Sequence, residues 1–204
     1  MRVVKWEALN KGKIRVIFED GIRCRLYRKE AMAFSLREGE QISDADYQKL
    51  IGDVLSKRAI KRAMHLLEQM DRTEMKLRQK LKEGEYPQSC IEDAIAYVKK
   101  YHYLDDKRYA ANYVRCAQEK KSRLQMRQKL AERGISRGLI DQTLDEEYTM
   151  DESEQIRELL QKRSYSFGKS DEKDFRRTYQ FLMRRGFPGN LILKEMKADI
   201  VLDI

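Results

Sequence analysis

The strongest constraint on the fold of this chain is an internal repeat of apolar positions. Leu81, Leu130 and Leu182 lie 49 and 52 residues apart, and each is followed ten and fourteen residues later by another apolar residue. An apolar or aromatic residue stands five positions after each leucine, and Gly134 and Gly186 stand four positions after the second and third. Self-similarity at this period is typical of stacked supersecondary units. The pattern predicts three copies of one helical module.

The modules should occupy the chain from residue 43 onward. Helical spacing of apolar residues predicts a linking helix and first repeat over 43–102, a second repeat over 103–149 and a third over 150–204. Residue types that favour helix N-termini stand where these helices should begin: Ser43, Asp71, Ser122, Ser136 and Asp151. We therefore predict a mainly α chain built of tandem three-helix repeats in a curved array.

The first 42 residues have a different pattern. Residues 13–18 and 22–27 alternate apolar with mostly basic residues, which is typical of half-buried strands. A three-residue loop ending at Gly21 would give the two strands a uniformly apolar face. The paired residues would then be Phe18 with Ile22, Val16 with Cys24, and Ile14 with Leu26.

Val3, Val4 and Trp6 predict a third strand in the same small antiparallel sheet. A lone hairpin is only marginally stable in water, so residues 1–42 should rest on the helices that follow. Arginines would line the outer face of the sheet as ordinary exposed strand residues: Arg15, Arg23 and Arg25.

The charge balance indicates the kind of partner. Lys and Arg number 43 against 34 Asp and Glu, which gives a net charge of +9. Such an excess favours an acidic partner, either nucleic acid or an anionic protein surface. A solvated surface of mixed sign is the other interpretation.

Basic residues recur at matching positions before each repeated leucine. Of the positions nine, five and one residues before the three leucines, seven of nine are Lys or Arg, although only 43 of all 204 residues are. Positions four apart share one face of a helix. The predicted partner- or DNA-binding residues are this stripe and nearby cations: Arg58, Lys61, Arg62, Arg72, Lys76, Arg78, Lys80, Lys121, Arg123, Arg127, Lys129, Lys173 and Arg177. Alternatively, these side chains pair with acidic residues of neighbouring helices.

The sequence lacks the motifs of common catalytic sites. It contains no P-loop and no dinucleotide-binding fingerprint, and His65 and His102 have no metal-ligand spacing with a cysteine. We therefore predict no catalytic residues, metal or cofactor. Five tyrosines cluster near one repeat junction and are expected to pack in the core between repeats rather than to stack on bases: Tyr97, Tyr101, Tyr103, Tyr109 and Tyr113.

Other features concern the compartment. No apolar run approaches the roughly 20 residues that span a bilayer, and the first residues lack the apolar core of a signal peptide. Cys24, Cys90 and Cys116 are odd in number and far apart, which argues against a disulfide framework. We predict a monomeric cytoplasmic protein without membrane contact.

Three segments carry a family resemblance. Residues 103–114 resemble the segment that opens the middle repeat of RecX regulatory proteins. Residues 126–135 resemble that family's second helix and its Gly-Ile turn, and residues 182–187 resemble its last repeat. One departure is Lys121-Ser122-Arg123, where members often carry a glycine; Ser122 is a good N-cap, so we expect the fold to survive.

The resemblance implies three tandem three-helix repeats and no catalysis. It also implies binding to the RecA recombinase and its nucleoprotein filament, with modulation, usually inhibition, of RecA activity. The basic stripe would then contact acidic RecA surface or DNA phosphate.

Two alternatives stay open. The chain could be a free-standing DNA-binding regulator whose third helices begin with base-reading residues, for which Gln88, Arg137 and Asn190 are candidates. It could also be a scaffold for an unrelated acidic protein.

Overall fold

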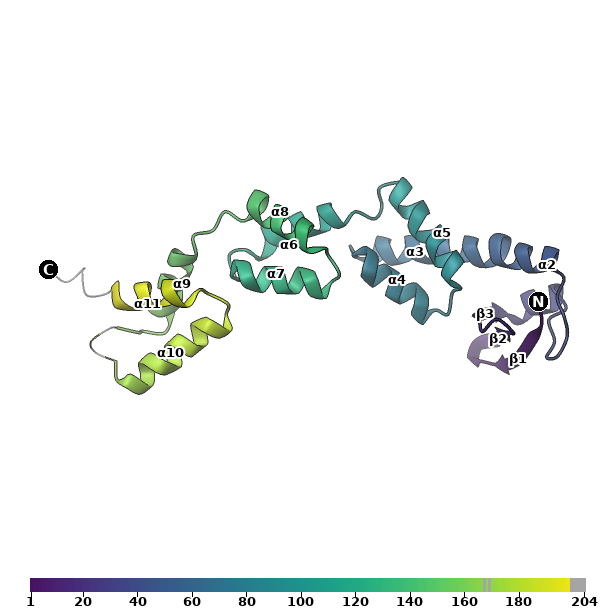
Figure 1. Cartoon of the computed structure of the whole chain (residues 1–204), viewed down its shortest axis with the longest axis horizontal. Coiled ribbons are helices and arrows are strands. Elements are labelled where there is room, and N and C mark those ends of the chain that lie inside the picture. Colours follow the sequence, from purple (N-terminus) through teal and green to yellow (C-terminus); the bar gives the residue numbers. More distant parts are fainter. Residues whose placement is uncertain (167, 169, 199–204) are drawn as a thin grey trace. The chain divides into compact units, whose positions relative to one another are not determined.

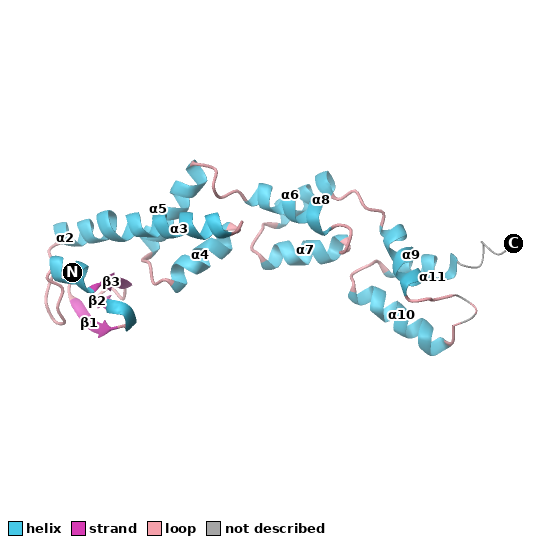
Figure 2. Ribbon diagram, turned by 180° about the vertical axis from the view of Figure 1, so that it is seen from behind, coloured by secondary structure: helices cyan, strands magenta, loops and turns pink. Residues whose placement is uncertain are grey.

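The computed structural model describes residues 1–166, 168 and 170–198. The chain divides into two compact units, residues 1–106 and 107–204. The end of the predicted third repeat, 199–204, lies outside the described residues. Strands occur in the first unit, and helices make up most of the described chain, as Figure 2 shows. The prediction of a mainly α fold with a small amino-terminal sheet is confirmed.

The amino-terminal sheet has three antiparallel strands in the order β1-β2-β3 (Figure 1). These are β1 Val3–Ala8, β2 Lys13–Phe18 and β3 Arg23–Tyr27. The predicted register is confirmed, because Ile14 pairs with Leu26 and Val16 with Cys24. Gly21 has φ +81° in the loop, a conformation that glycine adopts without steric cost.

One face of the sheet packs on the helices that follow. Ile14, Val16 and Phe18 are buried in one apolar cluster with Leu50 and Leu55. These leucines lie in a long helical segment that links the sheet to the first repeat (Figure 1). The segment runs through α2 Asp44–Lys49, a π-helical stretch Leu50–Ser56 and α3 Lys57–Gln69, and the short helix α1 Arg28–Ala33 follows β3 directly.

Three helices form each repeat. The first contains α3, α4 Glu74–Glu83 and α5 Gln88–Lys100. The second contains α6 Asp106–Ala117, α7 Arg123–Glu132 and α8 Arg137–Glu147. The third contains α9 Glu152–Lys162, α10 Glu172–Arg184 and α11 Gly189–Ala198. The three repeated leucines are completely buried, and so are the apolar residues ten and fourteen positions later: Ile91, Ile95, Ile140, Leu144, Ile192 and Met196.

The same turn closes the second helix of every repeat. The amide five residues after the leucine donates to the leucine carbonyl in all three, as in Tyr86 to Leu81 at 3.4 Å and Ile135 to Leu130 at 3.1 Å. The residue before that amide is left-handed, with φ +84° at Gly134 and +81° at Gly186. This is the Schellman arrangement, which satisfies carbonyls at a helix end and reverses the chain toward the third helix.

The first repeat has Glu85 at the left-handed position, with φ +56°. Its carboxylate accepts hydrogen bonds from Arg15 Nε at 2.9 Å and from Arg25 Nε at 2.9 Å. The expectation that the sheet arginines are ordinary exposed residues is therefore wrong for Arg15 and Arg25. These hydrogen bonds, chiefly from Arg15, lower the pKa of Glu85 to about 2, because they stabilise the ionised carboxylate.

In the first two repeats, the start of the second helix is capped by its own N-cap residue and by the repeat that follows. The side chains of Thr73 and Ser122 accept from the amides of Lys76 and Gln125 and so cap α4 and α7. The first residue of the following repeat then bonds the next free amide. Asp106 Oδ1 accepts from the Glu74 amide at 2.8 Å, and Glu152 Oε1 accepts from the Arg123 amide at 2.9 Å.

The predicted helix starts are mostly confirmed, with one correction. Ser43, Ser122 and Asp151 accept backbone amides as N-caps, while Ser136 occupies the cap position without a side-chain bond. Asp71 is not the cap of the second helix. That helix begins two residues later, because Thr73 is extended, buried and bonded to the Lys76 amide.

Gly186 gives a test of the contact between the second and third repeats. A Cβ there would lie 2.9 Å from Ser122 Oγ, and the Ser122 hydroxyl donates to the Arg185 carbonyl at 2.6 Å. Gly186→Ala should therefore lower the free energy of unfolding by about 1–2 kcal/mol, since it combines left-handed strain with a clash. Gly138→Ala, in α8 with open space around it, should cause no loss. Urea denaturation of both variants measures the difference; equal stabilities would contradict it.

Glu85 gives a second test. Glu85→Gln should destabilise the chain by about 1–2 kcal/mol near neutral pH, because the strained backbone stays while the charged bonds are lost. Glu85→Gly should lose less, since glycine relieves the strain. The pKa is lowered in the folded state, so the stabilisation is present above about pH 4.5 and is lost as pH falls toward about 2. The stability gap between wild type and Glu85→Gln should shrink over that range in pH-dependent denaturation; a constant gap would refute this role.

Candidate partner-binding surface

The predicted stripe is not a continuous helix face in the first two repeats. Arg72 and Lys121 precede the N-caps Thr73 and Ser122 and so lie outside α4 and α7. The first stripe position of each of these two repeats therefore lies before the helix begins. Only in α10 do all three stripe positions belong to the helix.

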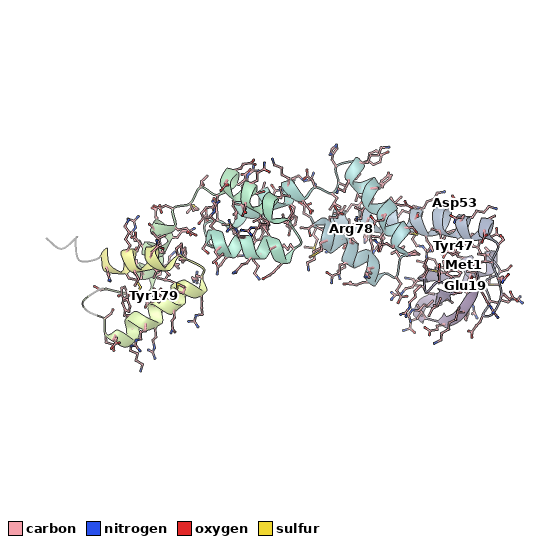
Figure 3. The ribbon with its side chains drawn as sticks, viewed as in Figure 1. Met1, Glu19, Tyr47, Asp53, Arg78 and Tyr179 are labelled. Carbon is pink, nitrogen blue, oxygen red and sulfur yellow. The ribbon has the colours of Figure 1, made fainter. Side chains whose placement is uncertain are left out.

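Most of the predicted cations of the first repeat have partners inside their own unit. Arg58 bonds Glu30 at 3.0 Å and lies over the Tyr27 ring at 5.3 Å. Arg78, which Figure 3 labels, pairs with Glu74 and with Glu92 of α5, both at 2.7 Å. The other two are Lys80, paired with Glu83 at 2.7 Å, and Arg72, which donates to the Leu66 carbonyl at 3.3 Å.

The second repeat uses its cations in the same way. Arg127 pairs with Asp141 of α8 at 2.7 Å. This bridge matches the one between Arg78 and Glu92, because both carboxylates stand eleven residues after the repeated leucine. The remaining contacts are Arg123 with Asp145, Lys129 with Glu132 at 2.8 Å, and Lys121 with the Tyr113 hydroxyl at 2.7 Å. Arg123 and Arg127 thus pair with acidic residues of a neighbouring helix, as the alternative describes, and the role of all four cations in partner binding stays a prediction.

The third repeat differs. Lys173 and Arg177 are exposed on α10, and no hydrogen bond or ion pair holds their side chains in the part of the chain that the structure describes. Phe181 and Arg185 continue the line at four-residue intervals. The guanidinium carbons of Arg163 and Arg185 lie 4.5 and 4.7 Å from the centre of the Phe181 ring. We call these residues, Arg163, Lys173, Arg177, Phe181 and Arg185, the α10 cationic face.

Two acidic residues beside this face, Asp171 and Glu172, are used locally. Asp171, Glu172 and Lys173 line a shallow hollow together with Arg176 and Arg177. Asp171 accepts from the Asp174 amide as the N-cap of α10, and Glu172 pairs with Arg176 at 2.6 Å. The face therefore keeps a surplus of positive charge. Among the other predicted cations, Lys61 and Arg62 are exposed and Lys76 is half-buried, and all three lack a hydrogen bond or ion pair within the described residues.

Two cations of the α10 cationic face were missed by the sequence analysis. Arg185 stands one further step of four along the stripe, so an extension of the same count would have included it. Arg163 is the C-cap of α9, and the fold of the third repeat brings its side chain to Phe181.

The tyrosine prediction is wrong for three of the five residues. Tyr97, Tyr101 and Tyr103 expose 39, 50 and 47% of their surface. Tyr109 and Tyr113 are partly buried against the core of the second repeat, as expected. Tyr97 and Tyr101 lie one turn apart on the outer side of α5, so their spacing does not lead into the core.

The described residues contain no group of three or more His, Cys, Asp or Glu placed to hold a metal ion. No helix in that part of the chain is long and apolar enough to cross a membrane. The three cysteines are unpaired, with Cys24 and Cys90 buried and Cys116 exposed.

Comparison with known proteins decides the family. Models of the first, second and third three-helix domains of RecX match residues 59–97, 105–144 and 151–194. The chain belongs to the RecX family. Regulatory protein RecX of Geobacillus kaustophilus is 31% identical over 87% of this chain and 68% of its own length. That of Clostridium botulinum is 26% identical over 100% of this chain and 98% of its own.

Solved RecX structures support the fold. A crystal structure of regulatory protein RecX has a TM-score of 0.65 and 24% identity, and the alignment covers 97% of this chain and 98% of that one. RecX from Lactobacillus salivarius has a TM-score of 0.63 and 20% identity over 72% of this chain and 97% of its own. The RecX resemblance is thus confirmed. The departure at Lys121-Ser122-Arg123 leaves the fold intact, because Ser122 caps α7.

The distinction between a cation that bridges two helices and one that pairs within its own helix can be tested by stability. Arg78→Ala should lower Tm by about 2–4 °C, because Arg78 joins α4 to α5 through two carboxylates. Lys80→Ala should leave Tm almost unchanged, since its partner Glu83 lies three residues away on the same exposed helix surface. Thermal unfolding followed by circular dichroism measures both, and equal shifts would contradict a bridging role for Arg78.

Proposed function

We propose that this RecX protein binds RecA and the RecA–DNA filament and inhibits RecA's ATPase and recombination activities. In this proposal it acts as a cytoplasmic monomer in DNA repair and the SOS response, without catalysis of its own. The observation that carries the proposal is the α10 cationic face. A surface that keeps four cations without carboxylate partners among the described residues favours an acidic partner, and the family relatives are named regulatory proteins.

The electrostatics support an encounter with a polymer of high negative charge. An exposed cation with no acidic side chain nearby gains little electrostatic stabilisation within its own protein. It can therefore still form a favourable ion pair with a ligand. If Lys173 and Arg177 neutralise DNA phosphates, binding releases condensed counterions and falls steeply with salt. If they contact acidic residues of RecA instead, the salt dependence is shallower. Arg62 and Lys76 are the cations of the first unit that we assign to the same role.

The free-standing DNA-binding alternative has less support. Of the residues proposed to read bases at the starts of third helices, Gln88 donates to Glu92, and Arg137 lies 3.7 Å from Asp141. Each of these two side chains thus interacts with an acidic residue one turn further along its own helix. Asn190 is exposed, but the equivalent positions of the three repeats share no residue type.

Charge reversal on α10 tests the proposal. The double variant Lys173→Glu, Arg177→Glu should raise the concentration needed for half-inhibition of RecA ATPase by about tenfold or more, because it replaces attraction by repulsion. Lys194→Glu, Lys197→Glu is the matched control, with the same charge change on exposed residues of α11, and should shift inhibition by less than about twofold.

The assay is RecA-dependent ATP hydrolysis on single-stranded DNA, titrated with each variant at several salt concentrations. Circular dichroism establishes that the variants are folded. Unchanged inhibition by a folded Lys173→Glu, Arg177→Glu protein would refute the role of the α10 cationic face.

A further inference from the structure

A row of exposed tyrosines lies at the end of α5, within the first unit. The ring centres of Tyr97 and Tyr101 are 4.7 Å apart, and those of Tyr101 and Tyr103 are 6.5 Å apart. The three tyrosine residues expose between 39 and 50% of their surface. Neither the repeat architecture nor the α10 cationic face accounts for three aromatic side chains gathered at the surface.

The backbone beneath the row is fixed. The Tyr103 and Leu104 amides both donate to the Val98 carbonyl, at 2.9 and 3.2 Å, and His102 is left-handed with φ +57°. Val98 and Leu104 are buried in the core of the unit. The tyrosines therefore stand on a helix end and turn that are anchored from below, so little backbone freedom would be lost when a ligand binds them.

Cations border the row. Lys100 Nζ lies 5.6 Å from the centre of the Tyr101 ring. Tyr97 also forms one wall of a shallow hollow on α3, which Lys57, Lys61, Met64 and His65 line. Two acids beside this hollow interact with its other side chains, since Asp53 pairs with Lys57 at 2.9 Å and Glu68 lies 3.9 Å from His65. Lys61 and Lys100 have no carboxylate within ion-pair distance among the described residues.

We propose that this surface, made of Tyr97, Tyr101 and Tyr103 with Lys61 and Lys100, binds single-stranded nucleic acid directly. Exposed aromatic rings stack on unpaired bases with about 1–3 kcal/mol per base, and cations beside them hold the phosphates. In a duplex the base faces are already stacked, so the rings would have nothing to bind. An acidic protein would use the lysines but not a row of adjacent ring faces. The negative charge of a single strand suits the lysines, and its unstacked bases suit the tyrosine rings.

This site does not depend on the proposed contact with RecA, so it is tested without RecA. Fluorescence anisotropy with labelled oligo(dT) should show binding by the wild-type protein that exceeds binding to duplex of the same length. Tyr97→Ala, Tyr101→Ala should weaken binding by at least about tenfold, because two stacking faces are lost. Tyr97→Phe, Tyr101→Phe should retain affinity within about threefold, since the rings remain.

Tyr27→Ala is the matched control, because Tyr27 is a similarly exposed tyrosine on β3, 45% exposed, outside the row. It should bind oligo(dT) like wild type. Lys61→Glu, Lys100→Glu should weaken binding and flatten its salt dependence. An oligo(rU) arm shows whether the strand is DNA or RNA.

Three results would overturn this proposal. They are equal affinity of the folded alanine variant and wild type, equal binding of duplex and single strand, and loss of RecA inhibition by the alanine variant with unchanged oligonucleotide binding. The last would assign the tyrosines to a protein contact. Because Lys173 and Arg177 lie on a different unit, failure of the α10 test leaves this measurement interpretable, and the reverse also holds.

Discussion

The left-handed turn that ends the second helix of each repeat is the constraint on which the structure depends. It fixes where the third helix starts, and so it places the apolar residues of that helix against Leu81, Leu130 or Leu182. Glycine meets the backbone requirement at no steric cost in two repeats. In the first, Glu85 is strained by about 1–2 kcal/mol. The hydrogen bonds from Arg15 and Arg25 offset that strain, so the amino-terminal sheet and the first repeat stabilise each other.

The caps at the repeat junctions explain why many acidic side chains form their contacts inside the protein. Asp106 and Glu152 complete the N-termini of α4 and α7, where a carboxylate is also favoured by the helix dipole. Other acids bridge the second and third helices through Arg78 and Arg127. Many carboxylates of the first two repeats are thus engaged inside the protein by its own cations. The third repeat has Tyr179 where the others have the bridging arginine, and within the described residues Lys173 and Arg177 have no ion-pair partner.

The sequence predicted those features that depend on residues close together in the chain or on a strict period. The strand register followed from alternation and from the glycine that ends a three-residue loop, and the repeat followed from the spacing of three leucines. Prediction failed where a partner distant in sequence decides the outcome. Thr73 replaced Asp71 as the cap because the start of α6 bonds the same helix end. The stripe count treated all cations alike, because only the folded repeat shows which of these cations lies beside a carboxylate.

Under the two proposals above, the chain carries two binding surfaces of modest individual strength. In the proposed complex, the RecA filament presents protein surface and single-stranded DNA in the same polymer, so contact at one surface would hold the other at a high effective concentration near its own site. Two contacts that each contribute only a few kcal/mol can then exceed either alone by about 10²–10⁴ in affinity. On free DNA only the tyrosine surface would be engaged fully, and on free RecA only the cationic face. Selectivity for the assembled filament would then need no tight site, which fits a chain whose exposed cations and aromatic rings are spread over two units rather than gathered in one pocket.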